Sequence, residues 1–319
     1  RLQSGSKNDK KWAMLNLTEI AIGAFTERLK AAYTANFGRQ KPDYLDVICW
    51  VGRMSLERIA DSDALYHDVE HTLMVTLAGQ DILLGKHIRE GGITPDDWLH
   101  FVVTLLCHDI GYVRGVCIGD SDGTYIIDQT GNTISPPEGS SDASLTPYHV
   151  ERGKIFVRER FGQLDVLDVE RVITGLDLTR IPVPDEGDAN DTSGTAGLVR
   201  AADLIGQLGD PNYMRKINRL FYEFEETGAS EKMGFSSPAD LTKGYSNFFF
   251  KAAAPYIGQG LNYLRMTQQG KQWIANLYAH VFAAGHDQPQ LGPQRGDHRA
   301  DRERGRAAPP AREPFFVGR

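Results

Sequence analysis

Hydrophobic residues recur at intervals of three and four along most of the chain, the spacing of one helix face. Two clear examples are LTEIAIGAFTERLKAAY at 17–33 and TPDDWLHFVVTLLCHD at 94–109. The second begins with Thr94, Pro95 and Asp97, an order typical of a helix start with a capping box. The pattern predicts further helices at 148–161, 165–176, 195–208 and 212–226, and over much of 245–284.

One stretch departs from this pattern. GDSDGTYIIDQTGNTI, at 119–134, has two short β-prone runs on either side of a turn-forming QTGN, and it predicts a small hairpin. After about residue 285 the chain is rich in Pro, Gly and Arg and poor in large apolar residues, which favours disorder. The expected fold is therefore all-α. Helices at 1–60 pack on a core at 61–284, which carries the hairpin insertion at about 116–135, and a disordered tail covers 285–319.

Composition narrows the classes of partner. A net charge of −7 argues against a general nucleic-acid or membrane-surface binder, which would need a basic face. The three cysteines, Cys49, Cys107 and Cys117, form no CxxC pair, as expected of a protein in a reducing cytoplasm. No apolar run reaches the roughly 20 residues of a membrane helix. We expect a cytoplasmic protein without a nucleic-acid or membrane partner; the oligomeric state is left open.

The candidate chemistry begins at YHDVEHT, 66–72, where helical spacing would put His67 and His71 on one face. Taken alone, the pair supports two interpretations equally: a metal or catalytic role, or one histidine on the surface and one satisfied in the core. His108 and Asp109 end a helix apolar enough to be buried, where an unsatisfied charge would cost at least ~2 kcal/mol. Asp203 lies on another apolar helix face. Asp109 would be satisfied by capping a neighbouring helix or by pairing with an Arg, and Asp203 by an ion pair with Arg200 or another basic residue.

Together these residues supply two imidazoles and two carboxylates, a set that suits divalent first-row metals. The order His … His-Asp … Asp resembles the HD-domain superfamily of metal-dependent phosphohydrolases. YHDVEHT is similar to the Tyr-His-Asn-x-x-His-Ala motif of the class I 3′,5′-cyclic-nucleotide phosphodiesterases, and the stretch from Ala202 to Phe235 resembles the region around that family's last metal-binding Asp. The resemblance spans about 66–263.

The resemblance implies a function and a set of roles. His71, His108, Asp109 and Asp203 would hold a tight metal ion, usually zinc. Asp109 would bridge to a second ion, magnesium or manganese. Water activated by the two ions would attack phosphorus, and His67 would protonate the departing 3′ oxygen, with Asp68 or Glu70 orienting its ring. The products would be 5′-monophosphates.

The substrate contacts match the family less closely. Tyr66 would lie beside His67, and His149 is a candidate for the second metal or the phosphate, or a solvent-facing residue of a first helical turn. Asn247 and Phe250 lie where the family carries its purine-binding helix, but the family's glutamine has no clear equivalent. Two alternatives therefore stay open: an HD-type nucleotidase or nucleoside-triphosphate phosphohydrolase, and a noncatalytic ligand-binding module.

Overall fold

The structure is a computed structural model that describes residues 16–183, 192 and 194–286. By its contacts the chain divides into two units, Arg1–Gly285 and His286–Arg319. All that follows concerns the first unit. The predicted tail lies outside the described residues, apart from the end of the last helix.

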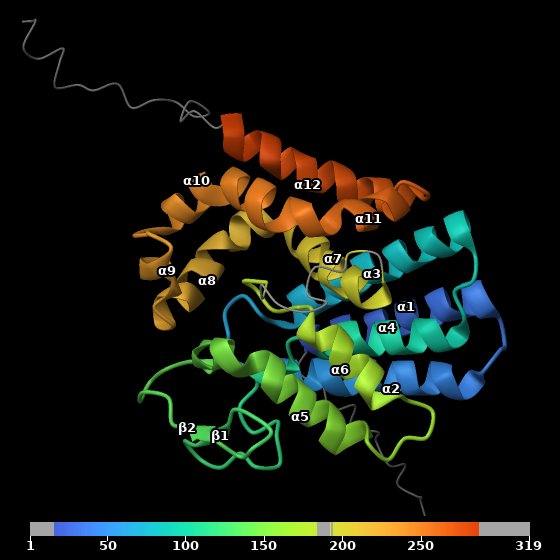
Figure 1. Ribbon diagram of the computed structural model, residues 1–319, viewed down its shortest axis with the longest axis horizontal. Coiled ribbons are helices and arrows are strands. Elements are labelled where there is room, and N and C mark those ends of the chain that lie inside the picture. The colour runs from blue at the N-terminus through green and yellow to red at the C-terminus, as the bar shows by residue number, and fades with distance from the viewer. Residues whose placement is uncertain (1–15, 184–191, 193, 287–319) are drawn as a thin grey trace, which may run out of the picture. The chain divides into compact units, whose positions relative to one another are not determined.

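Helices make up most of the described chain, and the strands found there form one two-stranded antiparallel sheet (Figure 1). The prediction of a mainly helical fold with a small hairpin is thus confirmed. None of the described helices is both long and apolar enough to cross a membrane.

The first elements are α1 (Leu17–Phe37), α2 (Pro42–Ile59), α3 (Val69–Glu90), α4 (Pro95–Cys107) and the 3-10 turn η1 (Ile110–Tyr112). The middle of the chain forms β1 (Tyr125–Ile126), β2 (Thr133–Ile134), the 3-10 helix η2 (Asp142–Tyr148), α5 (His149–Phe161) and α6 (Val169–Asp177). The remaining elements are α7 (Thr195–Leu208), α8 (Tyr213–Glu226), α9 (Ala229–Lys232), α10 (Pro238–Phe248), the π-helical turn η4 (Phe249–Ala253), α11 (Ala254–Leu264) and α12 (Gln268–His286).

Helix α3 packs against α4, α7 and α11, and its contact with α7 is the most extensive of the three (Figure 1). Glycine makes this approach possible. A Cβ atom built on Gly206 of α7 would lie 2.5 Å from the Cα atom of Val75 on α3, closer than real atoms approach. The two helices therefore lie backbone to backbone, which brings His71 of α3 near Asp203 of α7.

Helix α4 is buried along most of its length. Every residue from 98 to 107 is buried, and α2 and α7 pack on it. Its first turn has the predicted capping box, in which Thr94 accepts from the Asp97 amide and the Asp97 carboxylate accepts from the Thr94 amide. Because the helix is buried through to its last residue, Cys107, the His-Asp pair that follows it is held inside the protein.

The hairpin is anchored by one buried arginine. Strands β1 and β2 pair with Tyr125 opposite Ile134. The fully buried Arg152 of α5 donates to the carbonyls of Gly111, Val113 and Ile126 and forms an ion pair with Asp120 at 2.9 Å. This side chain fastens the insertion to the segment that directly follows Asp109.

Candidate metal centre

Helix α3 starts later than the histidine spacing suggests. It begins at Val69, and Asp68 is its N-cap, with the carboxylate accepting from the His71 amide at 3.0 Å. His67 therefore lies just before the helix, and the prediction that both histidines share one helical face is wrong. The two rings still meet, with centroids 5.4 Å apart at an interplanar angle of 82°.

His108 and Asp109 occupy the junction between α4 and η1. Nδ1 of His108 donates to the carbonyl of Leu105 at 2.8 Å, which directs Nε2 away from the backbone. That Nε2 lies 3.0 Å from Oδ2 of Asp109 and 3.3 Å from Nε2 of His71. The two imidazoles thus point their Nε2 atoms at the same place.

Asp203 completes the group from the opposite side. Its Oδ1 atom lies 3.6 Å from Nε2 of His71 and 3.8 Å from Nε2 of His108. Oδ2 of Asp109 lies 3.2 Å from Nε2 of His71. All four predicted ligands are buried, and the structure brings them together from three segments of the chain. We call His71, His108, Asp109 and Asp203 the four-residue cluster.

The chemistry of these donors fits a divalent metal ion. Each of the two aspartates places one oxygen within 4 Å of both imidazole Nε2 atoms, and imidazole nitrogens with carboxylate oxygens are common ligands of zinc and its neighbours. Oδ2 of Asp109 is buried without a hydrogen-bond donor, although two imidazole nitrogens lie close to it. Burial alone would raise the pKa of Asp109, but the neighbouring histidines hold that pKa well below its ordinary value, so the carboxylate is charged. His71, His108 and Asp203 could hold an ion between them.

His67 has a partner that the sequence did not reveal. Its Nδ1 atom lies 2.5 Å from Oε2 of Glu223 on α8, and Oε1 of that carboxylate accepts from the amides of Tyr66 and His67. Burial lowers the pKa of His67, but the charge and hydrogen bond of Glu223 outweigh it and raise the pKa to about 9. His67 is therefore an imidazolium at neutral pH.

The expected orienting acids have other roles. Asp68 caps α3 and lies 3.5 Å from Arg219, and Glu70 pairs with Lys216 at 2.9 Å. The assignment of either residue to the His67 ring is thus wrong. Glu223 could have been found from its spacing, because it falls on the buried side of α8 among apolar residues.

Tyr112 is a second residue that sequence reasoning missed. Its buried ring stacks between His67 and His149, with centroids 4.4 and 4.6 Å away. The Tyr112 hydroxyl lies 3.5 Å from Nε2 of His67, where its oxygen can accept from a protonated ring. Both ring nitrogens of His67 thus face acceptors, which agrees with a charged ring.

His149 lies on the other side of Asp109. Its Nδ1 atom donates to the carbonyl of Thr146 at 2.6 Å, and its Nε2 atom lies 4.0 Å from Oδ1 of Asp109. Burial lowers the pKa of His149 to about 4, so the ring is neutral at pH 7 and Nε2 carries a lone pair. Gly111 permits this arrangement, because a Cβ atom there would lie 1.8 Å from the carbonyl oxygen of His149.

The predicted substrate residues divide into two groups. Tyr66 is buried beside the cluster, with ring contacts to His67 and His71. Asn247 is exposed, and Phe250 lines a separate pocket. No hydrogen bond, ion pair or ring contact among the described residues joins Asn247 or Phe250 to the cluster. Tyr66 and His149 are thus at the site, whereas the structure does not bring Asn247 and Phe250 to it.

Comparison with known proteins places the chain in a family. Residues 15–287 match the Npun_R2479-like family model, and the chain belongs to that family. Neither a curated protein nor a solved structure matches it.

Proposed function

We propose that this protein is a metal-dependent phosphohydrolase of the HD type, with a 3′,5′-cyclic nucleotide as the first candidate substrate. The observation that carries the proposal is the four-residue cluster with a charged histidine beside it. Its residues come from α3, the α4–η1 junction and α7. The Asp109 carboxylate faces His71 and His108 through Oδ2 and His149 through Oδ1. A hydrogen bond between the two imidazoles accounts for Nε2 atoms 3.3 Å apart, but it leaves Oδ2 of Asp109 buried without a donor, which a bound metal ion would satisfy.

His71, His108, Asp109 and Asp203 would hold the tight ion, and zinc suits these donors best. Asp109 and, through Nε2, His149 would face a second ion, for which magnesium or manganese is proposed. Bound ions would neutralise the phosphate and lower the pKa of a coordinated water.

The residues of the chain have their own part in the reaction. His67 holds a proton on a ring that Glu223 keeps charged, next to the cluster, where a departing alkoxide needs one. Tyr112 fixes the plane of that ring by stacking on it at 13°. Glu223 also accepts from two backbone amides, so its own position is fixed. His67 is thus prepared to act as a general acid.

The nucleobase contacts distinguish the two candidate enzymes. The positions of Asn247 and Phe250 leave no assigned purine contact at the cluster, which keeps a nucleotidase or triphosphate phosphohydrolase as the second candidate. That enzyme would use the same ligands and the same acid. A noncatalytic module would have no need of the His67–Glu223 pair.

One experiment separates these functions. The purified protein is analysed for bound metals and assayed with zinc, magnesium and manganese on cyclic nucleotides, nucleoside monophosphates and triphosphates. The proposal expects a bound transition metal and hydrolysis of a cyclic nucleotide, and it expects Asp203→Asn to lose both. Equal metal content in wild type and Asp203→Asn would remove the ligand assignment. Tight metal without turnover of any compound would favour the binding module.

A further inference from the structure

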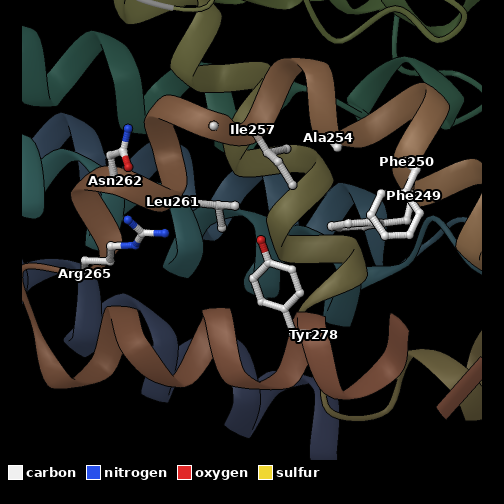
Figure 2. Close-up of a pocket in the computed structure, with 9 residues that line it drawn as sticks. Phe249, Phe250, Ala254, Ile257, Leu261, Asn262, Arg265 and Tyr278 are labelled. Atoms are coloured by element: carbon white, nitrogen blue, oxygen red, sulfur yellow. The ribbon is translucent and has the colours of Figure 1, made fainter. Parts of the chain in front are cut away.

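A cavity lies between α11, η4 and α12, and it shares no residue with the four-residue cluster. It encloses about 350 Å³, within the roughly 300–1,000 Å³ typical of small-molecule sites. Its walls are the side chains of Phe249, Phe250, Ile257 and Leu261, and Tyr278 of α12 rises toward them (Figure 2). Two large aromatic side chains in these walls are exposed to solvent, Phe250 at 61% and Tyr278 at 46%.

Two polar side chains of this cavity lie at one end of it. Asn262 and Arg265 lie together there, away from the two phenylalanines (Figure 2). No described acidic side chain pairs with Arg265, and no described group hydrogen-bonds the Tyr278 hydroxyl. Among the described residues that line the cavity, Arg265 is the one charged side chain. An apolar slot that ends at a single guanidinium complements a molecule with an apolar body and one negative charge.

Gly258 supplies an independent observation on the same wall. It lies in the middle of α11, where glycine is a poor helix former, and a Cβ atom there would meet nothing within 4 Å. Gly260, two residues later, differs, because its Cβ would press on Ala201 and Ile205 at 3.1 Å. Packing therefore explains Gly260 but not Gly258, whose missing side chain keeps the cavity open.

We propose that this cavity binds a small carboxylic acid with an apolar body, its carboxylate on Arg265 and its body between Phe250 and Tyr278. A carboxylate matches the planar fork of one guanidinium, and a single cation suits a monoanion better than a phosphate dianion. The proposal stands apart from the proposed phosphohydrolase function, because neither site contributes a residue to the other.

Calorimetric titration with 4-phenylbutyrate tests the proposal, with 4-phenylbutanol as its neutral analogue. We expect saturable 1:1 binding of the acid with a dissociation constant below about 1 mM. Arg265→Gln should weaken binding of the acid about tenfold and leave binding of the alcohol unchanged. Gly258→Leu should abolish binding of both, because its side chain fills the cavity.

Gly23→Leu is the matched control, since Gly23 also lies inside a helix with nothing within 4 Å of its Cβ position. Both leucine variants should fold at least as stably as wild type, and only Gly258→Leu should lose the ligand. Absence of saturable binding to wild type, or binding that survives in Gly258→Leu, would overturn the site. An equal loss of acid and alcohol in Arg265→Gln would overturn the assignment of the carboxylate.

Discussion

Nδ1 of His67 lies 2.5 Å from Oε2 of Glu223, although the two residues are 156 positions apart in the chain. The same carboxylate accepts from the amides of Tyr66 and His67 through its other oxygen. Glu223 is thus held by the backbone that carries the histidine, and it keeps the ring charged beside the four-residue cluster. The protonation state of His67, the proposed general acid, therefore depends on Glu223, and this dependence can be tested.

Replacement of the Glu223 carboxylate should change the pH dependence of activity. In Glu223→Gln burial would dominate, and the pKa of His67 would fall from about 9 to below its ordinary 6.5. At pH 8 we expect kcat/KM to fall by roughly 10²–10⁴-fold, the usual contribution of a positioned proton donor. The loss should be smaller at pH 6. Glu226→Gln is the control, because Glu226 is on the same helix but binds Ser141. Parallel pH profiles for wild type and Glu223→Gln would contradict the acid role.

The same pair should make stability depend on pH. The folded pKa of His67 is raised above the unfolded value, so its stabilisation is complete below pH 6.5 and is lost as the pH rises through about 9. A shift of this size corresponds to a free energy on the order of 3 kcal/mol. Urea unfolding of the metal-free protein at pH 6, 8 and 10 measures it. The difference between wild type and Glu223→Gln should shrink with rising pH, and a constant difference would refute this origin.

Alanine variants of His67 and His71 should lose activity for different reasons. His71→Ala should lose metal and nearly all activity, since it removes one of the four proposed ligands. His67→Ala should keep its metal and its fold and slow the hydrolysis of an alkyl phosphodiester by roughly 10²–10⁴-fold. That deficit should become much smaller on a nitrophenyl phosphodiester, whose leaving group needs little protonation. Equal deficits on both substrates would remove His67 from this role.

Gly111 should tolerate no side chain. Its Cβ atom would lie 1.8 Å from the carbonyl oxygen of His149 and 2.7 Å from the amide nitrogen of Gly153, and neither backbone can yield without moving α5. We expect Gly111→Ala to lower the free energy of unfolding by roughly 1–3 kcal/mol and to weaken metal binding by displacing Asp109. Thermal unfolding and metal titration measure both effects. Gly23→Ala is the control, and a Gly111→Ala variant as stable as wild type would show that η1 and α5 are not so closely packed.

Local pattern alone was enough for much of the fold. The helical spacing of apolar residues, the capping box at Thr94 and the hairpin around 129–132 depend on neighbours in the chain, so they are visible in the sequence. The types of the cluster residues were visible for a related reason. Asp109 and Asp203 are carboxylates in apolar surroundings, which is costly unless a partner is present.

Contacts between distant helices were decided only by the tertiary structure. Helical spacing puts Glu223 on the apolar face of α8, but only the packing of α8 beside the start of α3 makes it the partner of His67. The position of Tyr112 between two histidines depends on Gly111, because the missing side chain lets η1 lie against α5. Phe250, in contrast, lies in the π-helical turn before α11, where it lines the cavity between α11 and α12 instead of the cluster. Spacing along a helix sets which residues share a face, but it does not set which other helix that face meets.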